Sequence, residues 1–343
     1  MKMAENPYIK QFPDLLDGRT VLYVHGFASS GQSGTVRRLR EVFPNATVIA
    51  PDLPIHPAEA LQLLRQTCET ERPDLIIGTS MGGMFTEKLH GFDRISVNPA
   101  MLMAETMKEH NMMGTQSFQN PRKDGVQEFY VDKALVKEYK AVTEQNFEAV
   151  DADEQHRVWG LFGDEDTTVN TYGLFSAHYP QSAHFHGEHR MNDRSFMHSV
   201  LPVIRWIDDR QQQRQRPVVY IGMETLCSHP LQGQQEPAPA ASAVKAVRFL
   251  IERYQVFFVV PSPRGEAVDA ASWLAEHVGI PAWRHTILTD RRDLLYGDYL
   301  VEAPTPWDKA NGETPLATRI EYGSDTFKTW DDVMEYFARL DGQ

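Results

Sequence analysis

A serine in a Gly-x-Ser-x-Gly motif is the residue most suited to do chemistry in this chain. The motif spans Gly78–Gly82 and has Ser80 at its centre. An apolar run (75–77) precedes it, and a helix-forming segment (81–89) follows it. A strand, a tight turn and a helix in this order lift the serine hydroxyl above the edge of a sheet, at the positive end of the helix dipole. The pattern predicts that Ser80 is a nucleophile, although a Gly-rich turn without chemistry is the simpler alternative.

An acid and a histidine follow this serine at positions that suit acyl transfer. Asp166 lies in a Gly-x-x-Asp turn after an apolar segment, with Asp164 as the reserve acid, and His189 lies just beyond another short apolar segment. A histidine takes and returns the serine proton, and a carboxylate holds the imidazole tautomer and steadies its charge. Ser80, Asp166 and His189 are therefore the predicted catalytic residues. Their order along the chain is that of α/β-hydrolases.

The negative charge that develops on a substrate oxygen needs backbone N–H donors. A β-branched and aromatic segment (20–24) predicts a buried strand, and His25-Gly26-Phe27 follows it directly. In α/β-hydrolases the loop after this strand supplies one such N–H, and the residue after the nucleophile supplies the other. We therefore expect Phe27 and Met81 to form the oxyanion hole.

Three histidines near the end of this region suggest a metal site as an alternative. His184 and His186 would share one face of a strand, and His189 follows them closely. No carboxylate or cysteine with matching spacing accompanies them. We therefore expect no metal and no cofactor.

The elements that must position these residues alternate between short apolar strands and helices. This alternation over residues 20–100 predicts a parallel, doubly wound sheet. Residues 101–156 interrupt it with Met-rich and polar helical segments, which we interpret as a cap over the serine. The methionines could line an acyl-binding surface or pack in the core. The alternation returns over 157–207, so the prediction is an α/β-hydrolase fold with a helical cap insertion.

The motifs occur together in one order. They are His25-Gly26-Phe27-Ala28-Ser29-Ser30, Pro51-Asp52-Leu53-Pro54, Gly78-Thr79-Ser80-Met81-Gly82-Gly83, Asn98-Pro99-Ala100, Gly163-Asp164-Glu165 and Gly187-Glu188-His189. With this set, the chain from Val21 to about Ile207 resembles the small YqiA-type esterases. The resemblance implies hydrolysis of carboxylic esters or thioesters without a cofactor. The residues after Gly163-Asp164-Glu165 depart from the family pattern, which leaves Asp166 the least secure member of the set.

A second α/β region follows the first. We expect the hydrolase domain to occupy 1–209, a polar linker 210–216 and a smaller Rossmann-like domain 217–343. Segments of the last region resemble the haloacid-dehalogenase-like (HAD-like) fold and its 5′(3′)-deoxyribonucleotidase branch. They are Val219-Tyr220-Ile221-Gly222-Met223-Glu224-Thr225-Leu226, Val259-Val260-Pro261-Ser262-Pro263, Gly297-Asp298-Tyr299-Leu300-Val301-Glu302-Ala303 and Trp330-Asp331-Asp332-Val333.

The departures from that branch predict a domain without phosphatase activity. Gly222 stands where the nucleophilic aspartate is expected, and Glu224 replaces the second aspartate. Pro261 and Gly265 replace the phosphate-binding hydroxyl and the lysine. Of the Mg²⁺-binding acid pair only Glu302 remains, since Ala303 follows it, and such a set would hold Mg²⁺ poorly. An unrelated α/β domain is the alternative interpretation.

The composition limits the partners and the location. The chain has 343 residues and a formal net charge of −13, which disfavours nucleic acid and anionic membranes as partners. Its two cysteines lie far apart, and neither an apolar leader nor a membrane span is evident, so we expect a cytoplasmic protein. A homo-oligomer is compatible with the sequence.

The predicted function is that of a serine hydrolase acting on a small-molecule acyl ester or thioester. Two alternatives belong to other classes of protein. One is a two-domain binding protein without catalysis, and the other is a phosphatase acting through the C-terminal domain. The contrast between a full Ser80/Asp166/His189 set and an eroded second site disfavours the first alternative, and Gly222 disfavours the second.

Overall fold

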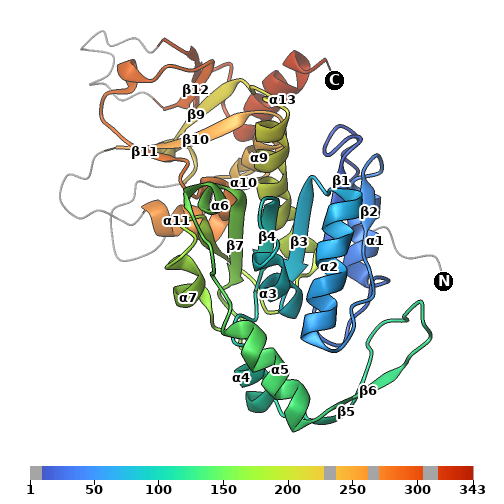
Figure 1. The fold of residues 1–343 in the computed structure, drawn as a ribbon. Helices are drawn as coiled ribbons and strands as arrows, with labels where there is room; N and C mark the ends of the chain where they lie inside the picture. The colour runs from blue at the N-terminus through green and yellow to red at the C-terminus, as the bar shows by residue number, and fades with distance from the viewer. Residues whose placement is uncertain (1–9, 228–236, 262–269, 304–315, 343) are drawn as a thin grey trace. The chain divides into compact units, whose positions relative to one another are not determined.

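The computed structural model describes residues 10–227, 237–261, 270–303 and 316–342. The chain divides into two compact units, Met1–Asp208 and Asp209–Gln343. Each unit contains its own parallel sheet (Figure 1).

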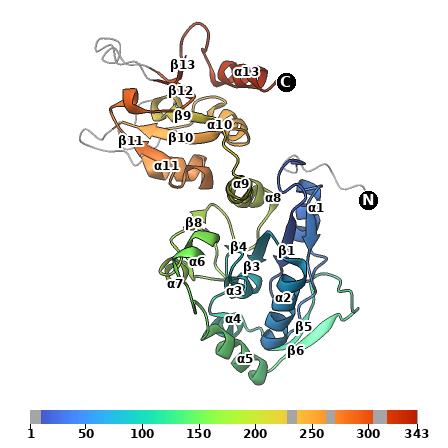
Figure 2. The ribbon, with the colours of Figure 1, turned by 45° about the horizontal axis from the view of Figure 1, so that its top comes forward.

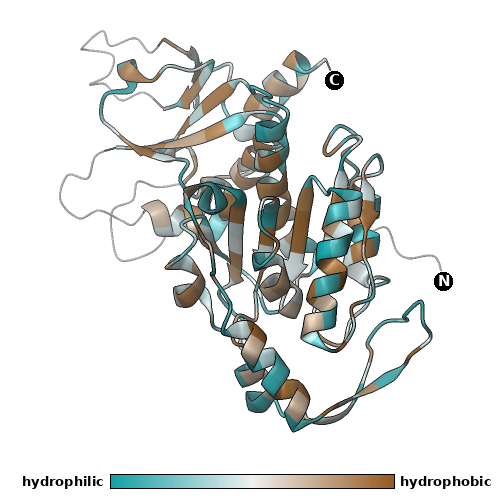
Figure 3. Ribbon diagram, viewed as in Figure 1, coloured by the Kyte–Doolittle hydropathy of each residue, from teal (hydrophilic) through white to brown (hydrophobic). Residues whose placement is uncertain are grey.

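The first unit is built on a sheet with the strand order β2-β1-β3-β4-β7-β8. All its strand pairs are parallel. The strands are β1 (Thr20–Val24), β2 (Thr47–Ile49), β3 (Leu75–Thr79), β4 (Asp93–Val97), β7 (Val158–Gly163) and β8 (Ser182–Phe185). The central strands β3 and β4 are buried along nearly their whole length, as expected when helices cover both faces of a parallel sheet. Of the two, β3 is the largely apolar one (Figure 3). This arrangement is the α/β-hydrolase fold that the sequence predicted.

Helices connect these strands and close the unit. They are α1 (Gly34–Val42), α2 (Pro57–Glu71), α3 (Met81–Glu87), α6 (Ala152–Arg157) and α7 (Tyr172–Ser176). The closing helix begins as α8 (Asp193–Ser195), passes through a π-helical turn (Phe196–Val200) and continues as α9 (Leu201–Gln211). It extends further than the predicted end at Ile207, so the first two residues of the predicted linker 210–216 are helical.

The insertion after β4 differs from the purely helical cap that the sequence predicted. It contains α4 (Met103–Glu109) and α5 (Lys133–Thr143), but a two-stranded antiparallel ribbon separates them. The ribbon consists of β5 (Gly114–Ser117) and β6 (Glu128–Val131). On β6 alternate residues are buried, so Phe129 and Val131 join the hydrophobic core and hold the ribbon in place.

The methionines of the insertion mostly serve as core residues. Met101, Met103 and Met107 are at most 1% exposed and belong to the main core cluster. Met112 packs against this cluster, and Met113 is exposed. The core-packing alternative therefore applies to the three buried side chains.

The second unit has a sheet with the order β11-β10-β9-β12-β13, and all its pairs are parallel. The strands are β9 (Val218–Gly222), β10 (Gln255–Val260), β11 (Thr286–Leu288), β12 (Tyr299–Glu302) and β13 (Thr318–Glu321). Its helices are α10 (Ala243–Ile251), α11 (Ala270–His277) and α13 (Trp330–Leu340), and Figure 2 shows them beside the strands. Trp273 and Trp330 are fully buried in its core. The sequence did not predict β13.

No helix in the described part of the chain is long and apolar enough to cross a membrane.

Candidate active site

Ser80 occupies the sharp turn between β3 and α3. Its backbone has φ 55° and ψ −122°, a conformation that is costly for a residue with a side chain. Hydrogen bonds hold it there. The Ser80 N–H donates to the Val97 carbonyl (2.9 Å), and the Ser80 carbonyl accepts from the N–H groups of Gly83 (2.9 Å) and Ala100 (3.0 Å). The turn is therefore fixed from both β4 and α3, and the hydroxyl is presented at the carboxyl edge of the sheet.

The flanking glycines allow this close approach of strand and helix. A Cβ atom at Gly78 would overlap the Thr86 hydroxyl and the Gly82 carbonyl. A Cβ atom at Gly82 would overlap the Val24 carbonyl of the neighbouring strand. Both glycines of the motif are thus needed because backbone occupies the space where a side chain would be.

The structure brings together the side chains of Ser80, His189 and Asp166, the three residues predicted to be catalytic. The His189 Nε2 atom lies 3.0 Å from the Ser80 Oγ atom. The His189 Nδ1 atom lies 2.7 Å from the Asp166 Oδ2 atom. The three side chains come from the loops after β3, β7 and β8, so they meet at one edge of the sheet although they are far apart in sequence.

The environment of Asp166 keeps this carboxylate ionised. Its side chain is only 4% exposed, and burial acts to raise its pKa. The hydrogen bond from His189 and the N–H groups of Val169 and Thr168 outweigh burial, so the pKa lies below its ordinary value. The reserve acid, Asp164, lies elsewhere: its Oδ1 atom accepts from the Gly187 N–H (3.0 Å).

Asn98 connects the loops that carry the acid and the histidine. Its side-chain amide donates to the carbonyls of Glu188 (3.1 Å) and His189 (3.0 Å). Its side-chain oxygen accepts from the Gly163 N–H (2.7 Å). Asn98 is 1% exposed and has φ 45°. No role was predicted for this asparagine, and the signal available was its position directly after a predicted strand.

The expected oxyanion-hole donors lie beside the serine. A Cβ atom at Gly26 would be 3.3 Å from the Ser80 Cβ atom, so the Gly26-Phe27 backbone adjoins the nucleophile. Met81 begins α3 directly after Ser80. Among the described residues, neither the Phe27 nor the Met81 N–H has a hydrogen-bond acceptor. Both groups can therefore donate to a bound substrate oxygen.

His25 positions the loop that contains Phe27. The Leu53 N–H donates to its Nε2 atom (3.1 Å), so Nδ1 carries the proton and donates to the Gly26 carbonyl (2.9 Å). Burial lowers the pKa of His25, which is 2% exposed. A neutral histidine thus joins this loop to the Pro51-Asp52-Leu53-Pro54 loop.

The ribbon insertion borders the same loop through aromatic rings and hydrogen bonds. The centroid of the Phe129 ring lies 5.3 Å from that of the Phe27 ring and 4.6 Å from that of the Phe118 ring. The Gln119 N–H donates to the Ala28 carbonyl (2.8 Å). An apolar wall therefore adjoins the expected oxyanion hole.

The three histidines considered as metal ligands do not converge. The His184 ring packs against Tyr172 at a tilt of 40°, with ring centroids 4.0 Å apart, whereas His186 faces Asp164 and His189 faces Asp166. Within the described ranges, no group of three or more His, Cys, Asp or Glu residues is arranged to hold a metal ion.

The second unit carries a different cluster at the corresponding edge of its sheet. The Arg292 guanidinium donates to Glu224 (2.7 and 2.8 Å) and to Glu302 (3.0 Å). Arg319 also pairs with Glu302 (2.6 Å). Burial acts to lower the pKa of Arg292, but the two carboxylates outweigh it and raise the pKa.

This cluster does not fit the Mg²⁺ that the HAD-like resemblance implies. The two carboxylates that would bind the metal already accept from arginine side chains, and Gly222 at the end of β9 offers no ligand. Pro261 lies just beyond β10 and is exposed, whereas Ser262, Pro263 and Gly265 lie outside the described residues.

Comparison with known proteins gives one family and several relatives. The model of the uncharacterised protein family UPF0227 matches residues 20–192. A protein of Vibrio phage KVP40 that carries the name 5′(3′)-deoxyribonucleotidase is 21% identical over 154 residues, which cover 38% of this chain and 89% of the phage protein.

Solved structures with similarity to the chain include two proteins named for ester or thioester chemistry. The thioesterase domain from the curacin biosynthetic pathway is 15% identical, with a TM-score of 0.33, covering 58% of this chain and 92% of that one. Est1E from Butyrivibrio proteoclasticus is 15% identical, with a TM-score of 0.38. The similarity covers 59% of this chain and 91% of Est1E. From the family match, this chain, with its α/β-hydrolase fold, belongs to the family UPF0227.

Proposed function

We propose that the first unit is a serine hydrolase that cleaves carboxylic esters or acyl thioesters through an acyl-enzyme on Ser80. The observation that carries the proposal is the continuous hydrogen-bond chain from Ser80 Oγ through the His189 ring to Asp166. A chain of this kind is required to remove the serine proton as the hydroxyl attacks a carbonyl.

Each residue has one role in the proposed reaction. The Asp166 carboxylate accepts a hydrogen bond from the Nδ1–H group of His189, which keeps Nε2 unprotonated and able to take the proton of Ser80. The serine oxygen bonds to the acyl carbon, and the Phe27 and Met81 N–H groups stabilise the oxyanion. His189 then protonates the leaving alcohol or thiol. Water, activated by the same imidazole, attacks the acyl-enzyme and releases a carboxylic acid. No cofactor takes part in these steps.

The surroundings of the serine favour an apolar group on the substrate. Phe27, Phe118 and Phe129 form the aromatic wall beside the expected oxyanion hole. An acyl chain or an aryl group can pack on such rings, whereas a highly charged substrate would gain little from them. The carboxylic ester and the thioester remain equivalent in this respect because the wall contacts the carbon chain.

We also propose that the second unit does not transfer phosphate. Support comes from the absent side chain at Gly222 and from the pairing of Glu224 and Glu302 with Arg292. The full-length protein should release no phosphate from nucleoside monophosphates with added Mg²⁺. Phosphate release that requires Mg²⁺ and disappears in Glu224→Gln would contradict this part of the proposal.

A substrate panel tests the esterase proposal. The wild-type protein should hydrolyse one or more members of a series of p-nitrophenyl esters and acyl-CoA thioesters of increasing chain length. The Ser80→Ala protein, purified in parallel and shown to be folded by circular dichroism, should lose this activity. Equal rates for both proteins would assign the activity to another group.

A further inference from the structure

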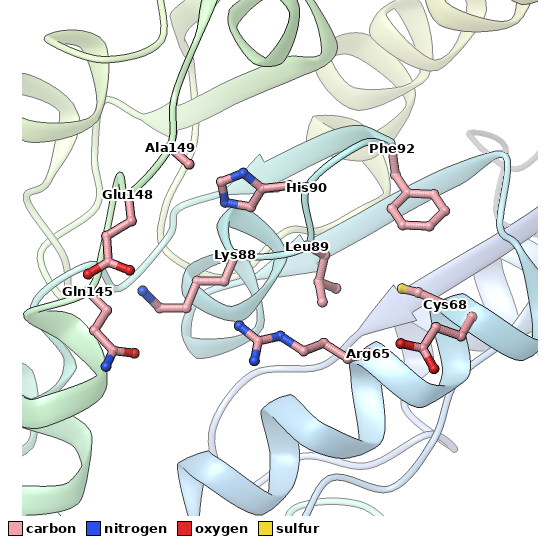
Figure 4. Close-up of a pocket in the computed structure, with 10 residues that line it drawn as sticks. Arg65, Cys68, Lys88, Leu89, His90, Phe92, Gln145, Glu148 and Ala149 are labelled. Carbon is pink, nitrogen blue, oxygen red and sulfur yellow. The ribbon is translucent and has the colours of Figure 1, made fainter.

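A cavity of about 560 Å³ lies in the first unit, away from the serine. Its walls come from α2, from the end of α3 with the turn after it, and from the segment that follows α5 (Figure 4). Lining residues include Arg65, Cys68, Lys88, His90, Phe92 and Glu148. A cavity of this size is within the range of small-molecule sites.

Lys88 is the unusual residue of this cavity because its charge is buried without a hydrogen bond. Its side chain is only 5% exposed, and its Nζ atom has no hydrogen-bond partner among the residues that the structure describes. The carboxylate of Glu87 lies 3.9 Å from Nζ, which is beyond hydrogen-bond distance. Burial lowers the pKa of Lys88. Leaving an ammonium in this state is costly, so the cavity is suited to a ligand that supplies acceptors.

Glu87 does not fill this need, because other groups hold it in place. Its Oε1 atom accepts from the Tyr179 hydroxyl (2.9 Å) and from the Phe147 N–H (3.1 Å). Its Oε2 atom is also buried without a hydrogen bond. The carboxylate therefore balances part of the charge of Lys88 but accepts no hydrogen bond from its ammonium group.

The cationic and the aromatic side chains of the cavity lie on different sides of it, and Glu69 on α2 also contributes to its wall. In Figure 4 the ends of the Lys88 and Arg65 side chains approach each other on the side of Gln145 and Glu148. Phe92 and Cys68 lie on the opposite side. Glu148 is exposed on its segment, whereas Lys88 is buried in the wall. The fixed, buried group is thus a cation, and a ligand must satisfy it with oxygen acceptors.

We propose that this cavity binds an organic anion whose carboxylate or phosphate oxygens accept hydrogen bonds from Lys88 and Arg65, while its apolar part packs against Leu89 and Phe92. Lys88 follows the last residue of α3, and Ser80 precedes the first. The rise of 1.5 Å per residue places the two about 12 Å apart along the helix axis. The anion site is therefore distinct from the reacting serine, and it does not depend on the proposed esterase activity.

Calorimetric titration of the Ser80→Ala protein tests the proposal, because turnover cannot then consume a probe. The probes are octanoate, octyl phosphate and octanol, which share the apolar chain and differ in the head group. Saturable binding of octanoate or octyl phosphate, with octanol at least 10-fold weaker, is the expected result. The anion that binds more tightly shows whether the cavity prefers a carboxylate or a phosphate head group. Binding of octanol as tight as that of the anions would overturn the proposal, as would the absence of anion binding.

Variants locate the bound anion. Lys88→Met keeps the length of the side chain and removes the charge, and it should weaken anion binding about 10- to 100-fold, as expected for a charge-assisted hydrogen bond. Arg65 is exposed, so its replacement should not impair folding strongly. Arg65→Gln should weaken anion binding about 3- to 10-fold. Lys137→Gln removes one exposed charge from α5 and should leave binding unchanged. Anion affinity that is equal in Arg65→Gln and Lys137→Gln would overturn the assignment to this cavity, even if Lys88→Met did not fold.

Discussion

Both units place polar side chains at the carboxyl ends of parallel strands, but the two clusters use their hydrogen bonds differently. In the first unit, the hydrogen-bond chain from Asp166 through His189 ends at the Ser80 hydroxyl, beside two N–H groups that have no acceptor within the described ranges. In the second unit, Glu224 and Glu302 meet the Arg292 guanidinium and neutralise one another. The sheet edge of the first unit keeps hydrogen-bond donors for a substrate. At the sheet edge of the second unit, the charged side chains already bind one another.

This difference shows why position in a fold does not determine activity. The edge of a parallel sheet gathers side chains from several strands whatever they are. In the first unit a serine hydroxyl and an imidazole meet there. In the second unit an arginine lies between two acids, pairs with both of them and offers no nucleophile. The following predictions test each side of this contrast, beginning with the largest expected effect.

Removal of the nucleophile or the base should have the largest effect. Ser80→Ala and His189→Ala should each lower kcat/KM for an ester by on the order of 10⁴- to 10⁶-fold, because the residues act as a unit. The kcat/KM of the double variant should lie within a few-fold of the kcat/KM of each single variant. Initial rates at ester concentrations well below KM give kcat/KM for each variant and check this. Additive losses would mean that the two side chains act independently.

Neutralising the acid should have the next largest effect. Asp166→Asn should lower kcat on the order of 10²- to 10⁴-fold, because an amide can hold His189 in the wrong tautomer. Asp164→Asn is the matched control, since Asp164 bonds to the Gly187 N–H rather than to His189, and it should change kcat less than about 3-fold. Steady-state kinetics on the best ester of the panel decide between them. The opposite ranking would move the acid to Asp164.

Removal of the central arginine tests the second cluster. Arg292→Met leaves two carboxylates facing each other without a counter-charge and should lower the free energy of unfolding by about 2–4 kcal/mol, given the partial exposure of the pair. The neighbouring Arg291→Gln removes a pairing with Asp293 at the surface and should cost less than about 1 kcal/mol. Urea denaturation of the full chain measures both. Equal stabilities of the two variants would deny Arg292 its structural role.

A methyl group at the serine turn should have a smaller effect on stability. Gly82→Ala should destabilise the protein by about 1–3 kcal/mol and also lower activity, because the added Cβ meets the Val24 carbonyl. Gly173→Ala is the control, since nothing lies within 4 Å of a Cβ there, and alanine favours the helix. Melting temperatures and ester rates would show the difference. A harmless Gly82→Ala would contradict the close packing of strand and helix.

The smallest predicted effect is on the pH dependence of stability. The pKa of Asp166 lies below its ordinary value, so its ionised form adds stability above the unfolded-state pKa of about 3.9. This contribution is lost as pH falls through the folded-state pKa. The gap in unfolding free energy between wild type and Asp166→Asn should therefore narrow below about pH 4. Denaturation at several acidic pH values measures this difference in unfolding free energy. A difference that widens as the pH falls would contradict a lowered pKa of Asp166.

The sequence predicted the parts of the molecule that rest on local patterns. Apolar strands bounded by Gly, Pro or Asp gave most of both sheets, and the Gly-x-Ser-x-Gly motif indicated the turn at Ser80 because its glycines are required by close packing. The choice between Asp164 and Asp166 stayed open, since both lie in one acidic turn. Only the folded loops show which carboxylate meets His189.

Features that depend on distant residues were missed. The β5–β6 ribbon is short, and β5 is polar, so its stability comes from Phe129 packing on Phe27 rather than from its own sequence. Arg292 lies in a short turn without periodicity, and its partner Glu224 is far away in sequence. The buried charge of Lys88 has no sequence signal, because a lysine after a short helix is ordinarily exposed.

Covalent labelling with a fluorophosphonate tests the central contrast most directly. The probe reacts with a serine that an adjacent histidine activates. Intact mass and peptide mapping of the full chain should show one adduct, on the peptide that contains Ser80, and none in the second unit. The adduct should be absent from Ser80→Ala and from His189→Ala. Labelling that persists in Ser80→Ala, or a wild-type protein that never reacts, would contradict the account.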